Sequence, residues 1–131
     1  MITETLALRL RERGLRWEPE SGDRFAISDH EFANEVFVVA ELTIDTVTVG
    51  AGRVFRFNGT TEWALDSIDA GECVWLPHEG QLRALLGPAF RSLVLERGEY
   101  VVTAVAGGEA LSFAARDAEC AYALALLACL G

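Results

Sequence analysis

The C-terminal segment, residues 118–130, is apolar on every side when it is drawn as a helix. Its large side chains are spread around the whole circumference, and alanines fill the spaces between them: Ala121, Tyr122, Leu124, Leu126, Leu127 and Leu130. A helix without a polar face is buried on all sides or covers a partner. We expect the rest of the chain to fold around this helix, with a homodimer interface as the alternative. Its apolar run, Cys120–Leu130, is 11 residues long and therefore shorter than the roughly 20 residues that cross a bilayer.

The residues before this segment predict a helix and then three strands. Pro77 is expected in the first helical turn, where a missing N–H is tolerated, and Gly87-Pro88 ends the helix. Glycine turns then separate apolar runs at 91–96, 100–106 and 110–114, and Asp117 is the expected N-cap of the last helix. The order is therefore helix-strand-strand-strand-helix.

The N-terminal half predicts one helix followed by an antiparallel meander. Ile2, Leu6 and Leu10 repeat at four residues, with Thr3 placed to cap the helix and Gly14 placed to end it. Strands are expected over four stretches: 24–28; a buried strand at 36–40; 43–49, with a bulge near Asp45; and 53–57.

Asn58-Gly59 favours a tight hairpin, because both residues tolerate positive φ. This turn predicts a further strand over Thr60–Leu65, and the alternative is a short helix that runs through Ile68.

These elements predict a single α+β domain over residues 1–131. It consists of an N-terminal helix, an antiparallel β meander, and a helix-strand-strand-strand-helix module that ends in a buried apolar helix. Residues 1–71 and 72–131 are the expected sub-modules. A chain of this length buries enough surface to form a core without a metal ion or disulfides.

The composition argues against several classes of function. The formal net charge is −9 and all 11 basic residues are arginine, so no lysine is present to act as a Schiff-base nucleophile or to hold phosphate in a P-loop. The negative charge opposes binding to nucleic acid. Residues 1–16 carry a local charge of +2 (four arginines and two glutamates), which we interpret as a solvated helix face.

The three cysteines have no CxxC spacing, and no secretory signal is recognisable. We therefore expect reduced thiols, a cytoplasmic location and no membrane association.

The strongest candidate binding residues are Trp63, Trp75 and His78, which could line an aromatic pocket for a small ligand or anchor a partner protein. Aromatic side chains more often fill a core. Asp29-His30-Glu31, joined by His78, would be the ligand set of a metal-dependent hydrolase, but consecutive loop residues rarely converge on one ion. We assign no catalytic residue, no metal ligand and no cofactor.

Several segments together resemble a known family: EVFVV (35–39), FNGTTEWALDS (57–67), WLP (75–77), QLRALLG (81–87) and AYALALL (121–127). In these segments the chain resembles a family of short, uncharacterised actinobacterial proteins, some of which carry a pilus-assembly (CpaE-like) label. That label implies a P-loop ATPase, which needs a lysine that this chain does not contain.

The element order over 78–130 also resembles that of the double-stranded-RNA-binding domain. That domain places basic residues at the start of its second helix, whereas Arg116-Asp117-Ala118-Glu119 is net acidic.

The leading interpretation is a non-enzymatic, cytosolic module that acts through protein–protein contact, with an unknown protein or with a second copy of itself. The alternatives are a small-ligand-binding domain with an aromatic pocket and, behind it, a metal-dependent hydrolase.

Overall fold

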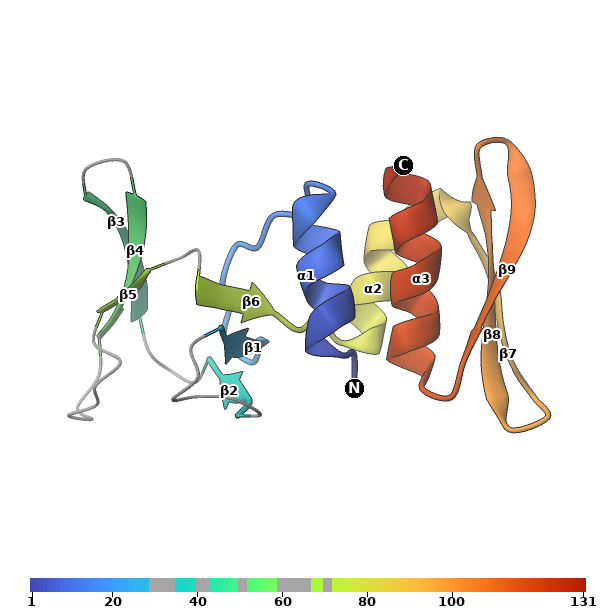
Figure 1. The fold of residues 1–131 in the computed structure, drawn as a ribbon, viewed down its shortest axis with the longest axis horizontal. Helices are drawn as coiled ribbons and strands as arrows, with labels where there is room; N and C mark the ends of the chain where they lie inside the picture. The colour runs from blue at the N-terminus through green and yellow to red at the C-terminus, as the bar shows by residue number, and fades with distance from the viewer. Residues whose placement is uncertain (29–34, 40–42, 50–51, 59–66, 70–71) are drawn as a thin grey trace. The chain divides into compact units, whose positions relative to one another are not determined.

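The computed structural model describes residues 1–28, 35–39, 43–49, 52–58, 67–69 and 72–131 (Figure 1). It has the predicted α+β architecture, with helices and antiparallel sheets. The chain divides into two compact units. Unit 1 contains Met1–Arg16 and Leu76–Gly131, and unit 2 contains Trp17–Trp75. This division differs from the sub-modules 1–71 and 72–131, because the N-terminal helix packs with the C-terminal residues.

Unit 1 is built around the C-terminal helix α3 (Ala118–Leu130), as the apolar composition predicts. The helices α1 (Glu4–Glu12) and α2 (Glu79–Leu86) pack against α3, and a three-stranded sheet packs against it as well (Figure 1). Seven residues of α3 are buried: Cys120, Ala121, Tyr122, Ala123, Ala125, Leu126 and Leu127. The expectation that α3 forms the core is confirmed, so most of its surface is covered by its own chain.

The sheet of unit 1 has the strand order β7-β8-β9, with β7 at Phe90–Glu96, β8 at Glu99–Ala106 and β9 at Glu109–Ala115. Two tight turns join the strands, at Arg97-Gly98 and Gly107-Gly108, and all four of these residues have positive φ, as type I′ hairpins require. Val102 and Ala104 of β8 are fully buried on the side that faces α3. Alternation along a strand places the residues between them on the opposite, outer face.

Capping residues define where the helices of unit 1 begin. The Thr3 side chain accepts a hydrogen bond from the Leu6 N–H, and Asp117 accepts one from the Cys120 N–H, as predicted. Pro77 is not in the first helical turn, because it precedes His78, the N-cap of α2. The Gln81 side chain accepts a hydrogen bond from the His78 N–H. After Leu86 the chain forms the 3₁₀ helix η3 (Gly87–Ala89) and enters β7.

In unit 2, one sheet has the order β2-β1-β6, with β1 at Arg24–Ile27, β2 at Phe37–Val38 and β6 at Cys73–Trp75. The prediction of a buried strand over 36–40 is wrong in its extent and for most of the described residues, since β2 has two residues and only Val39 is buried; Ala40 lies outside the described residues. Val36 is 43 % exposed and Val38 is 58 % exposed. Among the described strands, β2 pairs only with β1, so its apolar composition does not place it in a sheet interior.

A second sheet of unit 2 has the order β3-β4-β5, with β3 at Thr43–Val49, β4 at Gly52–Asn58 and β5 at Ser67–Asp69. The bulge predicted near Asp45 is wrong, because β3 and β4 pair continuously without an extra residue and the backbone ladder sets the register. The strand predicted over Thr60–Leu65 lies outside the described residues. Ser67 and Ile68 are in strand β5 and therefore do not belong to the alternative helix.

Candidate functional site

The three predicted binding residues are placed separately or not at all. Trp63 lies outside the described residues. Trp75 lies at the end of β6 in unit 2, and His78 is the N-cap of α2 in unit 1. The aromatic pocket therefore remains a prediction. His30 and Glu31 also lie outside the described residues.

Trp75 adjoins an aromatic cluster of unit 2. It is the β-ladder partner of the buried Phe25, whose ring lies 5.4 Å from the Trp17 ring and 5.5 Å from the Phe37 ring, measured between centroids. Asp23, which is 4 % exposed, accepts a hydrogen bond of 2.9 Å from the Trp17 indole N–H. The Trp75 indole N–H is buried and has no hydrogen-bond partner among the residues that the structure describes. Most of this cluster is core packing, and the Trp75 indole N–H is a buried donor for which the described part of the chain supplies no acceptor.

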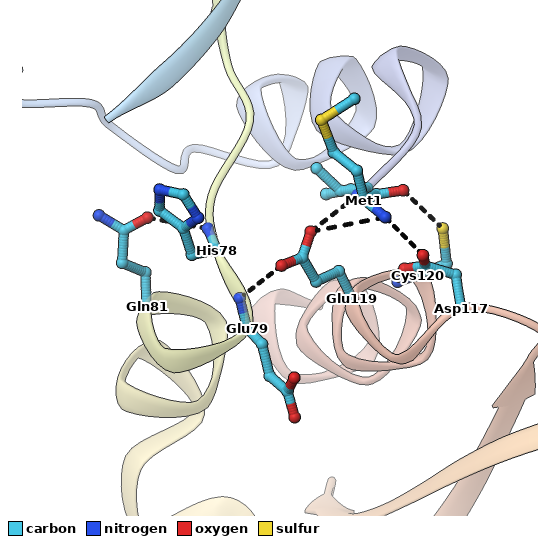
Figure 2. A network of polar contacts seen from close by, with 8 residues as sticks. Met1, His78, Glu79, Gln81, Asp117, Glu119 and Cys120 are labelled. Carbon is cyan, nitrogen blue, oxygen red and sulfur yellow. Dashed lines mark hydrogen bonds and ion pairs between the residues drawn. The ribbon is translucent and has the colours of Figure 1, made fainter. Parts of the chain in front are cut away.

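A second polar site lies in unit 1, where the N-termini of α1, α2 and α3 converge on Glu119 (Figure 2). One carboxylate oxygen of Glu119 accepts the Ile2 N–H at 3.1 Å, and the other accepts the Glu79 N–H at 2.9 Å. Because helix N-termini carry partial positive charge and unpaired N–H groups, a carboxylate is well suited to join them. Glu119 therefore connects the start of α3 to the starts of both other helices.

Asp117 extends this network to the amino group of Met1, which donates a hydrogen bond to it (Figure 2). That hydrogen bond raises the pKa of the Met1 amino group. Burial acts to raise the pKa of Asp117, but hydrogen bonds from the Met1 amino group and from the Cys120 N–H outweigh it, and the net effect lowers that pKa. Both groups are therefore charged near neutral pH and attract each other.

The chemistry available at this network is structural. Burial raises the pKa of the Cys120 thiol, which lies 3.8 Å from the Met1 carbonyl oxygen that accepts its hydrogen bond. A protonated thiol is a poor nucleophile. Within the described ranges, no group of three His, Cys, Asp or Glu side chains is arranged to hold a metal ion. The acidic groups of the network are already used to bind backbone N–H groups and the amino terminus.

Three of the exposed large apolar side chains of unit 1 lie on its sheet. Val94 is 48 % exposed, Leu95 is 62 % exposed and Leu111 is 40 % exposed. These residues belong to β7 and β9, the two strands at the edges of the sheet. Exposed apolar side chains that gather on one sheet are a feature of protein-contact surfaces. The periodicity of the strands did not predict this exposure, because exposure depends on what packs against each edge of the sheet.

Within the described residues, no helix is long and apolar enough to cross a membrane. Comparisons of the chain with protein-family models, with curated proteins and with solved structures found no match. The function is therefore argued from the geometry of the described residues.

Proposed function

We propose that the protein is a non-enzymatic module that acts through protein–protein contact at the β7-β8-β9 sheet. The observation that carries this proposal is the exposure of Val94, Leu95 and Leu111 on the two edge strands of one sheet, whose middle strand β8 packs against α3. Helix α3 is a poor candidate for the contact surface, because the chain's own elements bury most of it.

The charges around the sheet support a protein partner and argue against a nucleic acid. The chain has a net charge of −9, and binding to phosphate backbones requires a local excess of cations. Arg116 at the end of β9 is followed by Asp117 and Glu119, so the start of α3 offers no basic patch. A surface of apolar and small side chains with few charges is typical of the centre of a protein interface.

The test is site-specific photo-crosslinking in the organism that encodes the chain. A photoreactive side chain at position 111 on β9 reports on the sheet, and the matched control is position 85 on α2, since Leu111 is 40 % exposed and Leu85 is 41 % exposed. We expect covalent protein adducts of defined mass from position 111 and none from position 85. Equal labelling at both positions, or no adduct from position 111, would contradict the proposal.

A second candidate function is small-ligand binding near Trp75, favoured by its buried indole N–H without a hydrogen-bond partner among the described residues. A ligand that accepts a hydrogen bond from this N–H would change the fluorescence of Trp75. Titration with a panel of metabolites tests the idea, since a saturable change supports it and a flat response from the wild type removes it.

A further inference from the structure

The two edges of the β7-β8-β9 sheet differ in how they are protected from pairing with another strand. At β7 the register shifts between Phe90 and Ser92, and the Arg91 guanidinium donates hydrogen bonds to the carbonyl oxygens of Pro88, at 2.6 Å, and Phe90, at 3.2 Å. Bulges and charged side chains are the usual means of blocking an edge strand. The β7 edge is therefore blocked at its first residues.

Strand β9 has no bulge, and its one charged residue, Glu109, is at its first position. It pairs with β8 in an unbroken register from Glu109 to Ala115, without a bulge. Between Glu109 and Arg116 the sequence is Ala-Leu-Ser-Phe-Ala-Ala, with no proline and no charged residue. Ala110, Leu111, Ser112 and Ala114 are exposed. A regular, exposed edge strand whose interior carries no charge presents its outward N–H and C=O groups for pairing with another strand.

We propose that β9 pairs antiparallel with β9 of a second copy of this chain, so that two three-stranded sheets become one continuous sheet. The inference rests on the proposed function, since it names the surface and the partner through which protein contact occurs. A two-fold axis perpendicular to the sheet relates the two strands, and it passes beside Ser112. This register pairs the whole of Glu109–Ala115, because Ser112 is the middle residue of β9.

The side chains of β9 are complementary to themselves in this register. Leu111 of each copy lies opposite Phe113 of the other, on the face of the sheet that also carries Val102, so the 40 % exposed Leu111 gains an aromatic neighbour. On the outer face the facing residues are all small. Glu109 lies opposite Ala115, so no like charges meet directly.

The charges at the ends of β9 are also complementary between copies. In the same register, Glu109 of one copy and Arg116 of the other come to the same end of the paired strands, and their signs are opposite. A second copy therefore suits this edge even though the whole chain is acidic. A foreign strand would have to supply an equally small, uncharged segment.

Ser112 and Ser92 provide matched variants for the test. Both residues pair with Thr103 of β8, one from each side, and both therefore lie on the outer face. Ser112→Lys places two ammonium groups opposite each other across the proposed axis, whereas Ser92→Lys adds the same charge at the β7 edge. Ser112→Ala controls for loss of the 2.9 Å hydrogen bond between the Thr103 and Ser112 hydroxyl groups.

The dissociation constant of the dimer is measured by sedimentation equilibrium or by size exclusion with light scattering over a wide concentration range. We expect the full chain to dimerise, Ser112→Lys to weaken the dimer at least about tenfold through like-charge repulsion, and Ser92→Lys and Ser112→Ala to leave it unchanged. A strict monomer would overturn the inference, and so would equal weakening by both lysine variants.

Cross-linking tests the register directly. Residues directly opposite each other in antiparallel strands have Cα atoms about 4.5–5.5 Å apart, within the roughly 4.4–6.8 Å that a disulfide spans. Under mild oxidation, Ser112→Cys should form a disulfide-linked dimer, whereas Ser92→Cys and the wild type should not. Absence of the 112–112 disulfide would overturn the inference.

The experiments distinguish failure of β9 self-pairing from failure of the proposed function. A dimer that Ser112→Lys does not weaken, or a monomer that still gives adducts with another protein from position 111, removes β9 self-pairing while protein contact at the sheet survives. Absence of any protein adduct from position 111 removes the proposed function itself.

Discussion

Replacing Glu119 by alanine should destabilise unit 1, because this one carboxylate ties three helix N-termini together. The Glu119 side chain is 15 % exposed, so water cannot fully take its place. Loss of the carboxylate leaves the Ile2 N–H without an acceptor in a part-buried position, at a cost of about 1–3 kcal/mol. The Glu79 N–H is exposed and can be hydrated, which limits its cost to about 1 kcal/mol.

The expected decrease in the free energy of unfolding is therefore about 2–4 kcal/mol, a large part of the roughly 5–15 kcal/mol of a typical domain. The assay is urea unfolding followed by far-UV circular dichroism. This signal reports mainly on unit 1, which contains α1, α2 and α3. Tryptophan fluorescence reports on unit 2, because all three tryptophans lie within Trp17–Trp75.

The matched control is Glu12→Ala, which removes the same charge from an exposed position on α1. The control should change the free energy of unfolding by no more than about 0.5 kcal/mol. If Glu119→Ala is as mild as Glu12→Ala in the dichroism signal, the carboxylate does not hold the helices together and the reasoning is refuted.

Three further changes test the packing, the electrostatics and the turns of unit 1. Leu82→Ala removes a fully buried side chain and should cost about 2–5 kcal/mol, whereas Leu85→Ala on the same helix, at 41 % exposure, should cost far less; thermal unfolding compares them. The hydrogen bond to Asp117 raises the pKa of the Met1 amino group above its ordinary value of 8.0. The stability that this hydrogen bond contributes is therefore complete below pH 8.0 and is lost as the pH rises through the pKa of the folded state. Unfolding measured from about pH 7 to pH 10 should show this loss, and Asp117→Asn should remove it. Arg97→Asn should increase the free energy of unfolding by up to about 1 kcal/mol, because Arg97 has a φ of 53° that asparagine tolerates better. Urea unfolding should show this increase as a higher midpoint.

Local signals in the sequence predicted much of unit 1. Thr3 and Asp117 cap their helices as expected, since a capping side chain acts within three residues of itself. The glycines at 98, 107 and 108 mark the two hairpins, because the tight turns require positive φ. The apolar circumference of α3 predicted its burial, since no other arrangement within one chain hides such a helix.

Features that depend on distant residues were not predicted. Phe25 is the partner of Trp75 across a separation of 50 residues, and nothing in either strand specifies the other. Val38 is apolar and β-branched, yet it is 58 % exposed, because composition does not reveal whether a strand is at an edge. Glu119 is one acidic residue in a first helical turn, and its contacts with Ile2 and Glu79 arise only after the three helices assemble.

Amide hydrogen exchange at several protein concentrations tests most directly whether the β9 edge is a contact surface. If β9 pairs with a second copy, the N–H groups of Glu109–Ala115 that point away from β8 should become protected as the concentration rises, while Phe90–Glu96 should be unaffected. Exchange at β9 that is independent of concentration would contradict the account, as would new protection confined to β7.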